Sequence, residues 1–231
     1  MNNDNNRSLQ LKQNLLLLKA TQAVERAAEN TEEGLQYYLK HFVFTLDEHD
    51  ANLPAKRLPM EKEYLQELAH YFFTEPLLLV EKSRQMMVSW IMIACHLWDV
   101  QFHAGRRIFF QSKKETDANE MVNRAKFIYH NYPPIVRDVI YAKYPAKTPM
   151  AYLKLEFAKQ NSIIQGTPQG ADVLRQYTAS RIFSDEMAFQ SKAEEAFIAA
   201  KPTLVGGGSF MGVSSPNFKE FFYLSVNDQI Q

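Results

Sequence analysis

The chain has 231 residues, of which 46% are hydrophobic, and its formal net charge is zero. This length is sufficient for one α/β domain with a sizeable core. A single cysteine excludes a disulfide framework and is typical of proteins from a reducing compartment. No hydrophobic run approaches the roughly 18 residues that a membrane helix or its signal would need. We therefore expect a soluble, intracellular protein.

The first part of the chain is expected to be mainly helical. Residues 9–29 place leucine and alanine at helical spacing, which predicts one amphipathic helix that either packs against the domain or contacts another subunit. Residues 45–59 are polar and are interpreted as a surface loop. Residues 60–73 predict a second helix. We therefore divide the chain into an N-terminal helical extension and loop, residues 1–59, and an α/β domain, residues 60–231.

A strand–loop–helix segment follows at residues 77–94. Its apolar start predicts a buried strand and its apolar end predicts a helix. The usual phosphate-binding motif G-x-x-x-x-G-K-[ST] is absent. In an alignment with that motif, Lys82 and Met87 replace the glycines, Val88 replaces the lysine, and Ser89 keeps the terminal hydroxyl. A phosphate cradle needs backbone N–H groups at a helix start, a nearby cation, and a hydroxyl for Mg²⁺.

The loop contains side chains that supply these groups. Either Lys82 or Arg84 provides the cation from the other side of the loop, and Ser89 provides the hydroxyl. The candidate nucleotide-binding residues of this loop are Lys82, Ser83, Arg84, Gln85, Met86, Met87, Val88 and Ser89.

The middle of the chain is expected to alternate helices and strands. Hydrophobic patterning predicts a helix at residues 90–102, a strand at 108–111 and a helix at 115–129. The pair Pro133-Pro134 is interpreted as the stop of this last helix, and residues 133–149 are interpreted as irregular. The alternation within residues 152–165 predicts a hairpin of two strands.

Charge is unevenly distributed along the chain. Residues 1–75 carry 8 basic and 12 acidic side chains, whereas residues 101–160 carry 11 basic and 5 acidic side chains. A basic middle segment either faces DNA phosphates or forms an ordinary solvated surface, and composition leaves both interpretations open.

A second apolar run ends in two adjacent carboxylates, Asp185 and Glu186. This pattern is typical of a buried strand that emerges at the carboxyl edge of a sheet, where ligands bind in open α/β folds. Because side chains alternate along a strand, the two acids are expected to point in different directions. Phosphoryl transfer needs such a division, with one carboxylate near Mg²⁺ and a second group that orients water. The next predicted strand, at residues 209–213, is followed by Ser214, Ser215 and Asn217.

These motifs, in this order, resemble those of the large subunit of tailed-bacteriophage terminases, which are DNA-packaging motors. The sequence KSRQMMVSW at 82–90 resembles a deviant Walker A loop with its lysine at the start. SDE at 184–186 resembles the Walker B motif, and GVSSPN at 212–217 resembles the coupling motif. The resemblance covers about residues 40 to 225. The departures are Met87 and Val88, where most members carry glycine and often a small or basic residue.

The resemblance implies a RecA-like P-loop ATPase fold for residues 60–231, an α/β fold with a mainly parallel central sheet flanked by helices. It implies ATP and Mg²⁺ as cofactors, with Ser89 and Asp185 as metal ligands. Glu186 would activate the attacking water. The residues that would sense the γ-phosphate are Ser214, Ser215 and Asn217.

The remaining expected site residues are arginines and apolar side chains. Arg84 is a candidate catalytic residue that would contact the phosphate being transferred. By the resemblance, Arg175 is the finger that reaches a neighbouring subunit's nucleotide, unless it forms a local salt bridge with Asp172. The candidates for the adenine contact, each of which is otherwise a core residue, are Phe44, Leu58 and Tyr64.

By the same resemblance, the chain couples ATP hydrolysis to translocation of double-stranded DNA into a procapsid. Its implied partners are DNA, the portal, the small terminase subunit and further copies of the chain in a ring, in the cytoplasm of an infected bacterial host and without a membrane. A terminase nuclease domain normally follows the ATPase domain, and because the sequence stops near that point we expect no DNA cleavage. Two alternatives remain: a helicase-like, nucleic-acid-dependent ATPase, and a non-hydrolysing assembly module with a decayed phosphate loop.

Overall fold

A six-stranded sheet forms the centre of the protein. The computed structural model describes residues 2–47, 52, 55–147, 151–170, 178–217 and 221–226. The sheet has the order β3-β8-β7-β4-β6-β5, and all neighbouring strands are parallel except β5, which pairs antiparallel with β6. The strands are β3 (Leu77–Glu81), β4 (Arg107–Ser112), β5 (Lys154–Phe157), β6 (Ser162–Pro168), β7 (Arg181–Asp185) and β8 (Ser209–Ser214). This arrangement confirms the predicted α/β class with a mainly parallel sheet.

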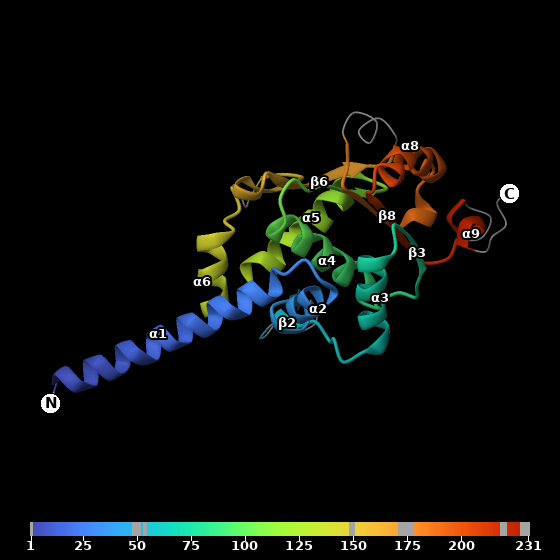
Figure 1. The fold of residues 1–231 in the computed structure, drawn as a ribbon. Helices are drawn as coiled ribbons and strands as arrows, with labels where there is room; N and C mark the ends of the chain where they lie inside the picture. Colours follow the sequence, from blue (N-terminus) through green and yellow to red (C-terminus); the bar gives the residue numbers. More distant parts are fainter. Residues whose placement is uncertain are drawn as a thin grey trace.

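Helices cover both faces of this sheet (Figure 1). One face packs against α3 (Glu63–Thr74), α4 (Val88–Phe102) and α5 (Glu115–His130), and the other against α8 (Ala193–Val205) and the short α9 (Phe221–Val226). Strand residues alternate between the two cores: Phe110 packs with the first set of helices, and its neighbour Phe109 packs with the second. Because both faces are covered, the strands are apolar runs, and the sequence shows them clearly.

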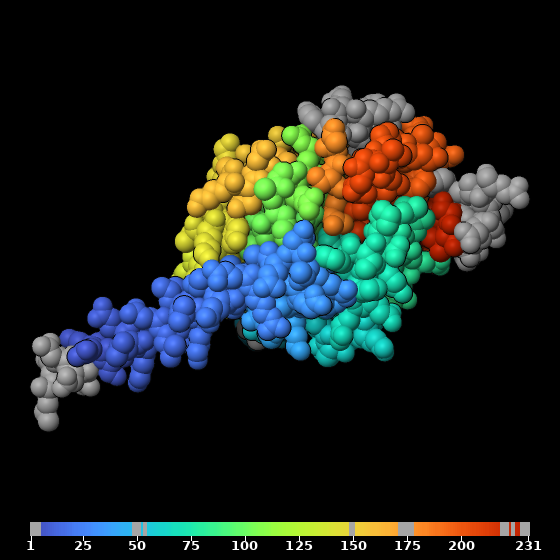
Figure 2. Space-filling model, in the orientation of Figure 1, coloured from blue at the N-terminus to red at the C-terminus, as the bar shows by residue number. Residues whose placement is uncertain are grey.

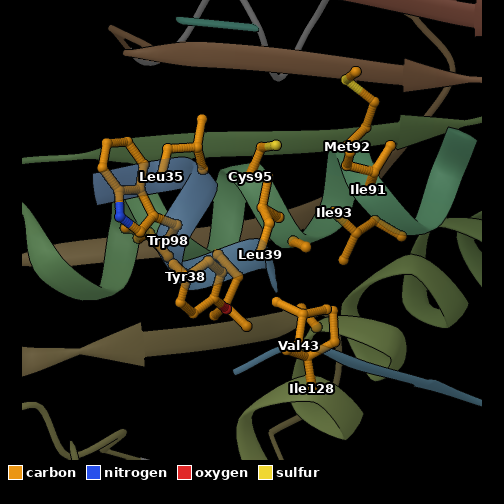
Figure 3. Close-up of a cluster of buried hydrophobic side chains, with 14 of the residues drawn as sticks. Leu35, Tyr38, Leu39, Val43, Ile91, Met92, Ile93, Cys95, Trp98 and Ile128 are labelled. Atoms are coloured by element: carbon orange, nitrogen blue, oxygen red, sulfur yellow. The ribbon is translucent and has the colours of Figure 1, made fainter. Parts of the chain in front are cut away.

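Helix α4 is the most deeply buried helix described. Apart from Ser89 and Trp90, its residues from Val88 to Phe102 are all buried. Figure 3 shows its side chains, including Cys95 and Trp98, packed against residues of α2 (Glu32–His41) such as Tyr38. Burial raises the pKa of the Cys95 thiol well above its usual value, so this cysteine is a packing residue. A mostly apolar helix suits this central position, although it also buries His96, Asp99 and Gln101.

The N-terminal helix α1 (Asn2–Ala27) extends away from the body for much of its length (Figures 1 and 2). Its last turns join the main core through Ala20, Val24 and Ala27. The Trp98 indole donates a hydrogen bond of 2.6 Å to the carbonyl of Ala27. The exposed leucines of the extending part are Leu9, Leu11, Leu15, Leu16, Leu17 and Leu18. The body end of α1 therefore packs as predicted, while the division of the chain at residue 59 remains a prediction.

Two predicted irregular segments contain regular structure. The expected loop at 45–59 overlaps a small antiparallel hairpin of β1 (Phe44–Leu46) and β2 (Ala55–Arg57). The expected irregular segment after residue 133 contains helix α6 (Pro134–Lys143), which has proline in its first turn. Both predictions were wrong. The helix was missed because a proline pair was interpreted only as a stop, although proline is also favoured in the first turn of a helix. The hairpin was missed because three-residue strands carry almost no periodic signal.

The predicted hairpin within 152–165 is confirmed as the β5–β6 pair. The short 3₁₀ turn η1 (Ala158–Gln160) joins its strands, and Asn161 adopts a left-handed conformation there, with φ 50°. Asparagine tolerates this conformation better than most residues. No helix in the described part of the chain is long and apolar enough to cross a membrane.

Candidate functional site

The loop between β3 and α4 forms the first half of the candidate site. The Lys82 N–H donates a 2.9 Å hydrogen bond to the Ser214 carbonyl, which fixes the loop start beside β8. Gln85 and Met87 then adopt left-handed backbone conformations, with φ 63° and 58°, and Met87 is the residue that caps α4. Residues 84 and 85 form a turn, and within the described part of the chain the N–H groups of residues 83–87 donate no backbone hydrogen bond of good geometry. These donors at a helix N-terminus are available to an anion.

The acidic pair forms the second half of the site. Asp185 ends β7 and is 8% exposed. Glu186 follows in a left-handed conformation, with φ 51°, and its side chain is 44% exposed. The Glu186 N–H donates a 3.0 Å hydrogen bond to Asp185 Oδ1. The two carboxylates therefore occupy different environments, one enclosed and one open to solvent.

Two contacts bring the halves together at the carboxyl ends of β3 and β7. Lys82 Nζ lies 3.4 Å from Glu186 Oε1, and the Lys82 side chain is only 11% exposed. The Ser89 hydroxyl lies near enough to the Asp185 carboxylate to lower its pKa, and both side chains line the same cavity. Residues about a hundred positions apart in the sequence thus meet at one edge of the sheet, which is where ligands bind in open α/β folds.

Burial dominates the electrostatics of Asp185. Burial raises the pKa of its carboxyl group, and the neighbouring Glu186 charge adds to that effect. The Ser89 hydroxyl and the Lys82 ammonium oppose it, without cancelling it. An enclosed carboxylate with a raised pKa is one that gains from a cation nearby.

The oxygen donors here fit Mg²⁺ bound together with phosphates. Ser89 and Asp185 provide a hydroxyl and a carboxylate, which are the hard donors that Mg²⁺ prefers. Among the described residues, no cluster of three histidine, cysteine, aspartate or glutamate side chains is able to hold a metal ion by itself. Such a sparse donor set suits Mg²⁺, because this ion usually keeps several waters and takes further ligands from a nucleotide.

A cavity of about 960 Å³ lies over these residues. Besides the loop and the acidic pair, the β1–β2 hairpin and α5 line it, contributing basic side chains that include Arg57 and Arg124. The Arg124 guanidinium lies 5.4 Å from the centroid of the Trp90 ring. Lys113 also lines the cavity. Sequence reasoning missed the hairpin and α5 residues because only tertiary packing brings these segments over the loop.

The residues after β8 contact the turn that follows the acidic pair. Ser214 is fully buried, and its Oγ accepts a 3.1 Å hydrogen bond from the Ala188 N–H. The Asn217 amide donates a 3.0 Å hydrogen bond to the Ala188 carbonyl. Ser214, Ser215 and Asn217 are not among the residues that line the cavity. Ser214 therefore contacts the site directly, through its carbonyl and the Lys82 N–H, and Ser214 and Asn217 also reach it through Ala188, two residues after Glu186. The sensing role of these residues remains a prediction.

Several predicted residues lie apart from this cluster. Arg84 is exposed and is not among the cavity-lining residues. Arg175 and Asp172 lie outside the described residues. None of the three adenine candidates is a lining residue: Leu58 is buried, Phe44 stacks under the Arg57 guanidinium, and the Tyr64 hydroxyl binds the loop.

Known structures share this fold. The large terminase of bacteriophage HK97 matches with a TM-score of 0.63 and 12% identity, covering 86% of this chain and 41% of that protein. The large terminase of a thermophilic bacteriophage, solved in complex with ADP, matches with a TM-score of 0.49 and 15% identity, over 73% of this chain and 42% of that one. The large terminase ATPase domain of Thermus phage P74-26 matches with a TM-score of 0.44 and 14% identity, over 65% and 63%.

No model of a protein family matches the sequence, and no curated protein matches it significantly. We base the fold comparison on the HK97 protein because its TM-score is the highest of these three. The chain spans 41% of the length of that protein. By its structure, this chain shares the RecA-like α/β fold of the HK97 large terminase over the part of that protein that it matches.

Proposed function

We propose that this chain is the ATP-hydrolysing motor domain of a viral DNA-packaging terminase. The observation that carries the proposal is the meeting of Lys82 and Ser89 with the acidic pair Asp185 and Glu186 at one sheet edge. A cation, a hydroxyl and two carboxylates in different environments are the groups that phosphoryl transfer from Mg²⁺-ATP requires.

The phosphates bind at the loop between β3 and α4. The N–H groups of residues 83–87 make no well-formed backbone hydrogen bond in the described part of the chain, so they are available to bind an anion. The positive end of the α4 dipole also favours negative charge there. Lys82 supplies the cation, because its ammonium lies at the acidic pair, whereas Arg84 is exposed and away from the cavity. Phosphate oxygens compete with Glu186 for Lys82, which releases the carboxylate for catalysis.

Ser89 and Asp185 would hold Mg²⁺, which when bound would supply charge neutralisation on the transferring phosphate. Glu186 is half open to solvent, so a water can reach its carboxylate. That carboxylate orients the attacking water and accepts its proton. Ser214 and Asn217 hold the Ala188 turn beside this carboxylate, and we assign to them the coupling of hydrolysis to movement.

The work done by hydrolysis is translocation of double-stranded DNA into a procapsid. The match of 86% of this chain to the HK97 large terminase supports this choice. The expected assembly is a homo-oligomeric ring at the portal, with the small terminase subunit as a further partner, in the cytoplasm of the infected bacterium. Arg175 is the candidate for a charge supplied to the neighbouring subunit's nucleotide.

The test is a comparison of Glu186→Gln with the unaltered protein. We expect the variant to bind ATP with unchanged affinity and to lose about 10² to 10⁴ in kcat, the usual contribution of a general base. Glu194→Gln is the matched control, because Glu194 is an exposed residue of α8, and it should keep full activity.

Three results contradict the proposal. Full turnover in Glu186→Gln removes the assigned base. If the unaltered protein does not bind ATP at millimolar nucleotide with Mg²⁺, the remaining interpretation is the non-hydrolysing assembly module. Strand separation of a DNA duplex by the unaltered protein, in place of DNA-stimulated hydrolysis without separation, identifies a helicase-like enzyme.

A further inference from the structure

The phosphate loop of this chain holds an unfavourable backbone conformation without glycine. Gln85 and Met87 have φ values of 63° and 58°. The left-handed region costs free energy for residues with a Cβ atom, and it persists only where the surroundings enforce it. The contacts around Met86, the residue between these two, therefore decide whether the loop keeps this shape.

One side chain from another helix binds the loop at that residue. Tyr64 lies in the first turn of α3, and its hydroxyl donates a 3.0 Å hydrogen bond to the Met86 carbonyl. The Tyr64 ring is partly buried against the main core, and the next residue, Leu65, is fully buried. The hydroxyl is thus presented by a packed helix, not by a mobile surface side chain.

This hydrogen bond determines the direction of the following N–H. A trans peptide unit is planar, and its C=O and N–H point to opposite sides. When Tyr64 holds the Met86 carbonyl on one side, the Met87 N–H must point to the other. The Met87 N–H donates to no residue in the described part of the chain, and both Met86 and Met87 line the cavity.

We propose that Tyr64 is a positioning residue for nucleotide binding: its hydroxyl holds the Met86 carbonyl and so keeps the Met87 N–H directed at the phosphates. This inference rests on the proposed ATP site. In the usual phosphate-binding motif, glycine allows the loop to adopt its conformation. Here a residue of a helix outside the loop would maintain that conformation. Tyr64 does not touch the reacting atoms.

The experiment measures ATP affinity and steady-state kinetics for Tyr64→Phe in the full chain. Loss of one neutral hydrogen bond predicts a Kd and KM for ATP raised about threefold to tenfold. The kcat is expected to stay within about twofold, because the acidic pair is unaltered. Tyr71→Phe is the matched control, since Tyr71 is an exposed tyrosine of the same helix, and it should leave Kd unchanged.

A second background separates positioning from simple loss of structure. Glycine adopts positive φ without steric cost, so the Tyr64→Phe effect on Kd should shrink to less than about twofold when Met87 is replaced by glycine. The melting temperature without nucleotide should change little in Tyr64→Phe. An equal loss of affinity in both backgrounds, or a large drop in this melting temperature, refutes positioning.

The outcomes also distinguish this inference from the proposed function. If the unaltered protein binds ATP and Tyr64→Phe binds equally well, the inference fails and the ATPase proposal stands. If the unaltered protein does not bind ATP, the proposed function fails and the role of Tyr64 falls with it.

Discussion

Replacing Lys82 by methionine tests which cation faces the phosphates. Methionine keeps the unbranched stem and removes only the charge. Lys82 Nζ lies 3.4 Å from Glu186 Oε1 with 11% of the side chain exposed. A unit charge pair at such a distance is worth about 5 kcal/mol at an effective dielectric constant of about 20. Desolvation of the ammonium offsets part of this energy. If a phosphate oxygen takes the place of the Glu186 carboxylate, we therefore expect Lys82→Met to lose about 3 kcal/mol of interaction with the phosphate.

A loss of that size corresponds to about a hundredfold to a thousandfold decrease in kcat/KM. Arg84→Met is the matched variant. Its side chain is exposed and does not line the cavity, so solvent and salt screen its charge, and kcat/KM should change by less than about threefold. Both are measured by steady-state ATP hydrolysis with Mg²⁺ at fixed ionic strength, after circular dichroism has established equal folding.

The opposite ranking refutes the reasoning. If Arg84→Met loses more activity than Lys82→Met, the phosphates approach the loop from the side that faces solvent, and the Lys82–Glu186 contact is a surface ion pair without a catalytic role.

Two further predictions concern the proposed metal ligands, and a third concerns the buried ion pair of Asp99 with Arg181 at the other end of β7. Ser89→Ala should weaken Mg²⁺ binding, raising the Mg²⁺ concentration for half-maximal hydrolysis about tenfold or more, because one of the two protein ligands of a weakly held ion is lost. Burial raises the pKa of Asp185, and only its ionised carboxylate binds a metal. As the pH is lowered, Mg²⁺ affinity should therefore begin to fall while the pH is still above 3.8, the ordinary aspartate pKa. Asp99→Asn should lower the free energy of unfolding by about 3 kcal/mol in urea titrations, because Asp99 is 1% exposed and its Oδ2 accepts a 2.7 Å bond from Arg181.

The Asp99 prediction carries a pH signature. Burial alone raises the pKa of this carboxyl group, but His103, Arg181 and Arg106 together hold it well below its usual value. A depressed carboxyl pKa stabilises the fold above the unfolded-state pKa of about 4, and this stabilisation is lost as pH falls below it. The stability difference between the unaltered protein and Asp99→Asn should therefore shrink in acid. If the stability difference between the two proteins is the same at pH 7 and pH 3, Asp99 does not form the ionised pair with Arg181 that is assigned here.

Matched measurements distinguish these effects from general damage. For the Mg²⁺ titration, an unchanged half-maximal concentration in Ser89→Ala removes this hydroxyl from the metal site. For the pH series, a metal affinity that stays constant down to pH 4 contradicts the raised pKa of Asp185. Substitution of Glu120, an exposed lining residue on α5, by glutamine is a control for nonspecific loss of negative charge near the cavity.

The sequence by itself determined the main elements and the order of the motifs. Strands β4, β7 and β8 are buried between the helices of both faces, so each appears as an apolar run. The edge strand β3 is only partly buried, but its residues are equally apolar. The adjacent acids mark where β7 ends. The same local patterns gave α3, α4 and α5 to within a few residues. Short or polar elements such as β1, β2 and α6 were missed because their signals are weak or were assigned to proline stops.

Only the tertiary structure decided which groups meet. The order β3-β8-β7 sets Lys82 beside Glu186 and Ser89 beside Asp185, and no local pattern encodes pairing between segments a hundred residues apart. The choice of Lys82 over Arg84 as the cation nearest the acids, and the Tyr64 contact with the loop, also depend on side chains from distant helices and strands. Local patterns reflect burial along one element, whereas a binding site depends on distances between elements, which are fixed only when the core packs.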